Sequence, residues 1–148
     1  MPLRFLGNPS VGLVDKLKNI LLAFVVFTAW IFIIQGFLGY LSKAQFDIPF
    51  KFQFFTACIL APLYEEYLFR VIPIKIASKL PSDLMMPIII FSSIIFGVLH
   101  GGPINILIQG VFGFILSCLF IKNNYSLWSV ILLHSTWNAF CLFVLEKA

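Results

Sequence analysis

Long apolar stretches alternate with short polar breaks along this chain. Apolar runs predict helices, and a helix needs about 20 apolar residues to cross a bilayer. Five stretches approach that length, the third being the shortest: residues 17–41, 52–74, 86–100, 104–121 and 126–145. The breaks contain glycine, proline or charged residues, which are typical of turns. The pattern predicts an all-α fold, a polytopic transmembrane bundle of about five helices.

The composition supports a membrane protein and argues against nucleic-acid binding. Of the 148 residues, 61% are apolar and 11% are charged, whereas soluble domains carry about 25% charged residues. The mean hydropathy is +1.03. The ten basic residues give a net charge of +4, but they are scattered singly and form no patch of the kind that binds nucleic acid. We expect the lipid bilayer, and no nucleic acid, as a partner.

The basic residues also predict the orientation in the membrane. The first apolar stretch exceeds the roughly 7 to 15 residues of a signal-peptide core, so we interpret it as a retained transmembrane helix. With the N-terminus inside, seven basic residues fall on the cytoplasmic half: Arg4, Lys16, Lys18, Arg70, Lys75, Lys79 and Lys122. Three fall on the other half: Lys43, Lys51 and Lys147. Because positive charges favour the cytoplasmic side, this predicts a multi-pass cell-membrane protein with a cytoplasmic N-terminus. The excess persists, six against three, if Arg70 lies within the membrane.

Ionisable side chains lie inside these apolar stretches, where they are expensive and therefore indicate a functional site. The second stretch holds Glu65, Glu66 and Arg70. The two histidines of the chain, His100 and His134, lie in the third and fifth stretches. Glu66 precedes Arg70 by four residues, the favourable order for a helical ion pair. Glu65 lies about 140° from Arg70 around the helix, so its carboxylate faces elsewhere. This predicts an intramembrane polar cavity with one carboxylate free for chemistry.

One asparagine completes a set of groups suited to peptide hydrolysis. His134 and Asn138 are four residues apart and project from one face of the last helix. Hydrolysis needs a base for water, an acid for the leaving amine and stabilisation of the oxyanion. We predict that Glu65 accepts a proton from water and that His100 holds this water. His134 and Asn138 would then donate to the oxyanion.

Simpler roles exist for each group on its own. Glu66 and Arg70 could form only a buried ion pair. His100 could close its helix by bonding a carbonyl, and His134 could join helices through a hydrogen bond. An estimate of depth in the membrane also separates Glu65 and His134 from His100. If each residue adds about 1.5 Å through a core of about 30 Å, Glu65 and His134 lie about 10 and 12 Å from the cytoplasmic side. His100 lies about 20 Å from that side by the same estimate.

A metal site is the alternative mechanism. Zinc binds histidine nitrogen and carboxylate oxygen, so Glu65, His100 and His134 could hold it together with a water. No His-Glu-x-x-His pattern is present, and the candidate ligands come from three predicted helices. We favour the metal-free mechanism and keep zinc as the alternative cofactor.

The motifs resemble those of the CAAX protease and bacteriocin-processing (CPBP) family of intramembrane endopeptidases, the Abi-domain proteins that include type 2 CAAX prenyl proteases. The resemblance covers about residues 54–142 and rests on three ordered motifs: Ala61-Pro62 before Glu65-Glu66-x-x-x-Arg70, Phe96-x-x-x-His100, and Ser126-Leu127-Trp128 before His134-x-x-x-Asn138. It implies a protein or peptide substrate at the membrane, with Glu66 and Arg70 supporting the four residues above. We accordingly divide the chain into an N-terminal segment with the first helix, residues 1–51, and a protease-like core, residues 52–145.

Two departures from the family pattern bear on its assembly. Family members commonly have glycine after the motif arginine, where this chain has Val71. They also commonly carry further helices ahead of the motifs, so this chain is either a minimal core or completes its cavity as a homo-oligomer. The alternative function is a catalytically silent membrane scaffold or bacteriocin-immunity-type protein. A proton-coupled transporter fits less well, since the five predicted helices contain no internal repeat.

Overall fold

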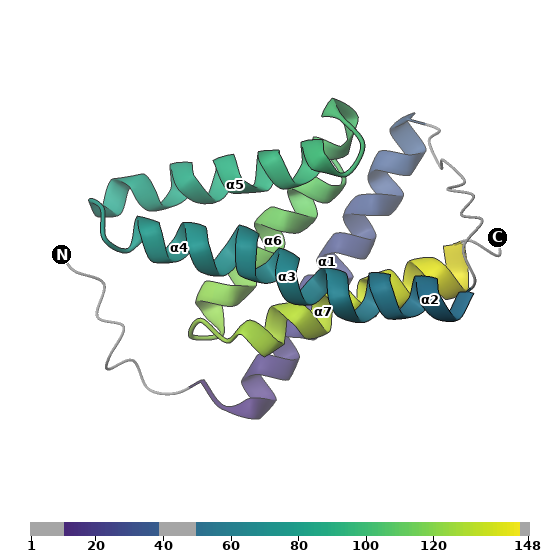
Figure 1. Ribbon diagram of the computed structural model, residues 1–148, viewed down its shortest axis with the longest axis horizontal. Coiled ribbons are helices and arrows are strands. Elements are labelled where there is room, and N and C mark those ends of the chain that lie inside the picture. The colour runs from purple at the N-terminus through teal and green to yellow at the C-terminus, as the bar shows by residue number, and fades with distance from the viewer. Residues whose placement is uncertain (1–10, 39–49, 146–148) are drawn as a thin grey trace.

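The computed structural model describes residues 11–38 and 50–145, and every regular element in them is helical (Figure 1). The first helix is α1 (Leu13–Leu38). The second runs continuously from residue 50 to 77 through α2 (Phe50–Phe55), α3 (Ala61–Glu66) and α4 (Ile72–Ala77). The others are α5 (Met85–Leu99), α6 (Gln109–Lys122) and α7 (Leu127–Phe140). The predicted all-α fold of five helices is confirmed.

The helix of residues 50–77, here called the motif helix, is not a regular α-helix. Two π-helical segments interrupt it, at Thr56–Leu60 and Tyr67–Val71. Each is followed within two residues by a proline, Pro62 or Pro73. A proline inside an α-helix removes one hydrogen-bond donor and collides with the preceding turn. Here a wider π-helical turn precedes each proline, and the helix continues through both of them. It ends at Ala77, three residues beyond its predicted end at residue 74.

The other boundaries differ from the predicted ones by a few residues. The first helix begins at Leu13 rather than residue 17, and the predicted residues 39–41 lie outside the described ranges. A 3₁₀ turn, Ser82–Leu84, starts the third helix, and another, Pro103–Ile106, precedes α6. Between α5 and this second turn, Gly101 and Gly102 have φ values of 129° and 102°. Glycine adopts that backbone without the steric cost of a side chain, and it ends α5 at the predicted break.

Among the described residues, three helices are long and apolar enough to cross a membrane: Leu13–Ile34, Ser82–Leu99 and Pro103–Lys122. The last helix continues from α7 into a π-helical segment, Cys141–Leu145, and its apolar stretch, Leu127–Phe143, is shorter. Large apolar side chains such as Phe32, Phe91 and Leu99 are exposed on the outside of the bundle, as expected for a surface in contact with lipid. The chain is an integral membrane protein.

The motif helix lies against both α5 and α7, which positions the polar residues. Its C-terminal half runs beside α5, and its N-terminal half runs beside α7 (Figure 1). Aromatic rings hold α1, α6 and α7 together, with Phe27 stacked on Phe112 at 4.4 Å and edge-on to Trp137 at 4.5 Å. The three motifs thus come from three helices packed about one place.

Candidate active site

Three helices bring the predicted charged and imidazole side chains together. Glu65 and Glu66 end α3, and Arg70 lies in the second π-helical segment. His100 caps the C-terminus of α5, and His134 projects from α7. Residues 30 positions or more apart in the sequence therefore meet at one site, and the side chains of Glu65 and His100 approach each other despite the difference in their expected depths.

Glu66 is the buried centre of this site. Its Oε2 lies 3.1 Å from Nε of Arg70, so the predicted i,i+4 ion pair forms. Its Oε1 lies 2.7 Å from Nδ1 of His134. Both Glu66 and Arg70 are fully buried, with 0% of each side chain exposed. The carboxylate therefore holds an arginine of its own helix and a histidine of α7, and the sequence predicted only the first of these.

The Arg70 guanidinium has further neighbours besides Glu66. Its Nη1 donates to the Phe69 carbonyl at 3.2 Å, and its carbon lies 4.7 Å from the ring centre of Phe96 in a cation–π contact. A Cβ on Gly113 would stand 3.3 Å from Nη2 and 3.0 Å from the Phe96 ring. Glycine at this position of α6 therefore gives the buried guanidinium and the ring their space, a role that no motif indicated.

Glu65 lies between the two imidazoles. Its Oε2 is 3.7 Å from Nε2 of His100 and 3.8 Å from Nε2 of His134. These separations exceed a direct hydrogen bond, and no other described group forms a hydrogen bond to this buried oxygen. The Glu65 side chain is 14% exposed and that of His100 is 30% exposed. A partly shielded carboxylate oxygen thus faces two ring nitrogens across a short gap.

Hydrogen bonds at the far side of each ring fix which nitrogen faces Glu65. Nδ1 of His100 lies 2.7 Å from the carbonyl of Phe96, which can only accept, so this nitrogen carries the proton. The Phe96 ring packs on the same imidazole, with centroids 4.3 Å apart. Nδ1 of His134 faces the Glu66 carboxylate and likewise donates. In the neutral form of either ring, Nε2 is then a hydrogen-bond acceptor.

Asn138 has a contact that the sequence did not indicate. Its Nδ2 donates to the backbone carbonyl of Ala57 on the motif helix at 2.7 Å. One of its two amide hydrogens is therefore engaged by the backbone, one helical turn beyond His134. This leaves the second hydrogen for the predicted oxyanion role.

The metal alternative concerns Glu65, His100 and His134. Within residues 11–38 and 50–145, no group of three or more His, Cys, Asp or Glu side chains could hold a metal ion. The two ring nitrogens stand 3.7 and 3.8 Å from one carboxylate oxygen, slightly farther apart than ligands that share one tetrahedral zinc ion at about 2.0–2.2 Å.

The fold and the site define a helical membrane protein with a carboxylate–histidine centre enclosed among its helices. Residues 47–140 match the family described as type II CAAX prenyl endopeptidase Rce1-like. The match spans more than half of the chain, and the chain belongs to this family of CAAX-type endopeptidases. The same comparisons match it to no curated protein and no solved structure. The resemblance predicted from the three motifs is confirmed.

Proposed function

We propose that this protein is an intramembrane endopeptidase in which Glu65 is the general base for water. The observation that carries the proposal is the position of the Glu65 carboxylate, which faces Nε2 of both His100 and His134 at 3.7 and 3.8 Å. A gap of this size between polar atoms is suited to a bridging water. The family membership supports a protease.

His100 orients the water in this proposal. Its Nδ1 hydrogen is bound to the Phe96 carbonyl, so Nε2 presents a lone pair toward the gap. The water donates one hydrogen to Glu65 and the other to His100, which directs an oxygen lone pair at the scissile carbonyl carbon. Glu65 takes the first proton as the carbon–oxygen bond forms.

An oxyanion role for His134 requires a proton on both of its ring nitrogens. Glu66 accepts from Nδ1, and the proton on Nε2 then points to the oxygen that becomes negative. In that form, the charges of Arg70 and one imidazolium would balance those of the Glu65 and Glu66 carboxylates. For Asn138, an oxyanion role and a positioning role are alternatives, which the cleavage rates of its variants distinguish. Collapse of the intermediate breaks the carbon–nitrogen bond as Glu65 returns its proton to the leaving amine.

The substrate is proposed to be a membrane-associated protein or peptide, cleaved near the cytoplasmic boundary of the cell membrane. The start of α1 and the turn after α6 lie at the same end of the bundle, because Nδ2 of Asn123 donates to the Lys16 carbonyl at 3.3 Å. This groups Lys16 with Lys122 and supports a cytoplasmic N-terminus. Zinc and homo-oligomerisation stay predictions.

Quantitative proteomics of protein termini tests the proposal in host membranes. We compare the wild type with Glu65→Gln, which keeps the shape of the side chain and removes the base. New termini that form only with the wild type support the endopeptidase and identify its substrate. Asp15→Asn is the matched control, because Asp15 is an exposed carboxylate paired loosely with Lys18 at 3.9 Å, and it should leave the termini unchanged. Identical termini in wild-type and Glu65→Gln membranes, at equal protein levels, would instead favour the silent scaffold.

A further inference from the structure

Two backbone carbonyls of the motif helix, those of Ala57 and Phe69, lie about one turn before a proline and accept side-chain hydrogen bonds from neighbouring helices. At the end of the first π-helical segment, the N–H of Ala61 donates to the Thr56 carbonyl, not to that of Ala57. The next residue, Pro62, has no N–H. The Ala57 carbonyl therefore receives no hydrogen bond from either residue. In a membrane such a carbonyl needs a partner within the protein.

Asn138 of α7 supplies that partner. Its Nδ2 donates to the Ala57 carbonyl at 2.7 Å. Because a carbonyl only accepts, the nitrogen and not the oxygen of the amide must face it. The bond joins the motif helix to the helix that carries His134, one turn away from that histidine.

A second bond of the same kind joins the motif helix to α5. In an α-helix the donor to the Phe69 carbonyl would be residue 73, which is a proline. The hydroxyl of Ser92 donates to this carbonyl at 2.9 Å, together with Nη1 of Arg70 at 3.2 Å. Ser92 lies on the same helix as His100, two turns before it.

The two bonds bracket the proposed base. Ala57 precedes Glu65 by eight residues, about two turns, and Phe69 follows it by four, about one turn. One bond fixes the motif helix to the helix of His134 and the other to the helix of His100. Sliding of either neighbour along the motif helix would break a bond and change the 3.7 and 3.8 Å separations at Glu65.

We propose that Asn138 and Ser92 are positioning residues, which hold Glu65 in register with the two histidines by binding the Ala57 and Phe69 carbonyls about one turn before Pro62 and Pro73. The inference rests on the proposed function for its consequence in catalysis. The hydrogen bonds themselves do not depend on it, so stability and cleavage can be tested separately.

The test removes the side-chain donor with and without the proline. Interhelical hydrogen bonds in membranes contribute about 0.6 kcal/mol on average and up to about 1.7. Asn138→Leu should therefore raise the unfolding equilibrium constant about 3- to 20-fold in lipid bicelles. Pro62→Ala restores a backbone N–H beside the Ala57 carbonyl, and in that background Asn138→Leu should change the constant less than about twofold. These variants form one double-mutant cycle. Ser92→Ala, measured with and without Pro73→Ala, forms the second cycle.

Ser93→Ala is the matched control for the second cycle. Ser93 is buried beside Ser92, but its hydroxyl donates to Ile89 of its own helix at 2.8 Å. Ser93→Ala should change the unfolding equilibrium constant by the same factor in the wild type and in Pro73→Ala. Equal effects of Asn138→Leu with and without Pro62 would overturn the inference for that bond.

Cleavage distinguishes positioning from direct participation. The rate is measured on the Glu65-dependent termini and divided by the amount of folded protein. If Asn138 acts by positioning, Pro62→Ala restores most of the rate lost in Asn138→Leu. A rate that stays low while stability recovers overturns the positioning role and assigns Asn138 to the oxyanion. If no Glu65-dependent termini exist, the proposed function fails, and the stability cycles alone decide the inference.

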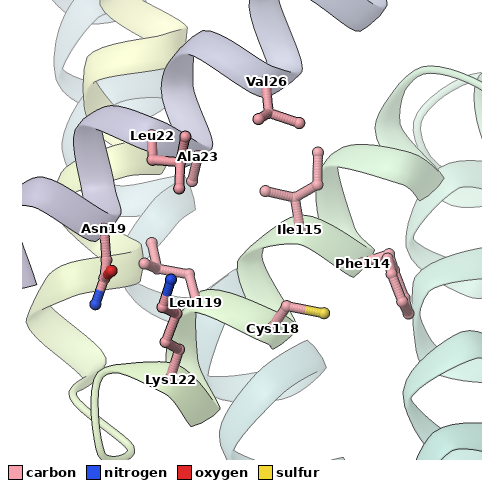
Figure 2. Close-up of a pocket in the computed structure, with 9 residues that line it drawn as sticks. All are labelled: Asn19, Leu22, Ala23, Val26, Phe114, Ile115, Cys118, Leu119 and Lys122. Carbon is pink, nitrogen blue, oxygen red and sulfur yellow. The ribbon is translucent and has the colours of Figure 1, made fainter.

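A separate observation concerns the outer surface between α1 and α6. A groove of about 200 Å³ lies there, lined on the α1 side by Leu22, Ala23 and Val26. Figure 2 shows the Lys122 amine and the Asn19 amide at one end and apolar side chains along the rest. Lys122 forms no ion pair with any carboxylate of the described residues. The groove is thus apolar along its length and positively charged at one end.

The geometry points to an anionic glycerophospholipid as its occupant, with one acyl chain in the groove and the phosphate at Lys122. Both walls belong to helices able to span the bilayer, so lipid chains reach them. A basic residue near an anionic headgroup contributes about 1 kcal/mol, or about fivefold in affinity.

Native mass spectrometry of the purified full chain, exposed to equal phosphatidylglycerol and phosphatidylcholine, tests this site. The wild type should retain phosphatidylglycerol preferentially, and Lys122→Gln should reduce its affinity for this lipid about fivefold. Lys79→Gln, in the loop after α4, is the matched control and should retain it as the wild type does. Equal retention of both lipids, an unchanged Lys122→Gln, or a lipid-free dimer that covers the groove would each overturn the assignment.

Discussion

The buried pair of Glu66 and Arg70 gives a prediction whose size follows from the structure. Glu66→Gln removes the negative charge while keeping the shape of the side chain. Arg70 is fully buried, and its other partners are the Phe69 carbonyl and the Phe96 ring. Neither neutralises a charge. Breaking one partner of a buried ion pair costs about 3–5 kcal/mol, and we expect a loss of stability in that range.

Arg70→Met should cost less than Glu66→Gln. The Glu66 carboxylate would still accept a hydrogen bond from Nδ1 of His134 at 2.7 Å, and a protonated His134 would balance its charge. The double variant Glu66→Gln/Arg70→Met leaves no unpaired charge, so it should be more stable than Glu66→Gln alone. Equilibrium unfolding of the four proteins in lipid bicelles measures the coupling. Effects that add within about 0.5 kcal/mol would indicate independent residues and refute the reasoning.

Three further predictions follow from the site and the topology. Gly113→Ala should destabilise the fold by about 1–3 kcal/mol through overpacking, because the added Cβ would stand 3.0 Å from the Phe96 ring. The control Gly12→Ala should have little effect in the same unfolding assay, because the nearest atom to its Cβ would be 3.7 Å away. Cleavage by the purified protein should persist in a strong chelator, and a loss that zinc restores would establish the metal mechanism instead. In a background without native cysteines, Lys79→Cys should react with an impermeant maleimide only from the cytoplasmic side. Ile104→Cys should react only from the opposite side, and the reverse pattern would invert the proposed orientation.

The sequence predicted the helices and the polar residues well, since both follow from local patterns. Apolar length located all five helices, and the i,i+4 spacing of Glu66 and Arg70 predicted their ion pair. The approach of Glu66 to His134 could not be predicted in this way, because it depends on how α7 packs against the motif helix. The same holds for the bond from Asn138 to Ala57.

The depth estimate failed for a related physical reason. It treated each helix as straight and perpendicular to the bilayer, and it placed His100 about 10 Å from Glu65 in depth. In the structure, Nε2 of His100 lies 3.7 Å from Oε2 of Glu65. The estimate also assumed regular α-helices, whereas π-helical segments at Thr56–Leu60 and Tyr67–Val71 interrupt the motif helix. The importance of Gly113 was also hidden, because the sequence does not show which side chains pack against this position.

The central claim is that Glu65 is the base, and the most direct measurement is the turnover of purified wild type and Glu65→Gln in lipid nanodiscs. The substrate is a peptide that spans the cleavage site found in host membranes, and equal unfolding temperatures confirm that both proteins are folded. General-base catalysis contributes about 10²- to 10⁴-fold, so kcat for Glu65→Gln should fall by at least about 100-fold. Turnover by Glu65→Gln within tenfold of the wild type would contradict the account.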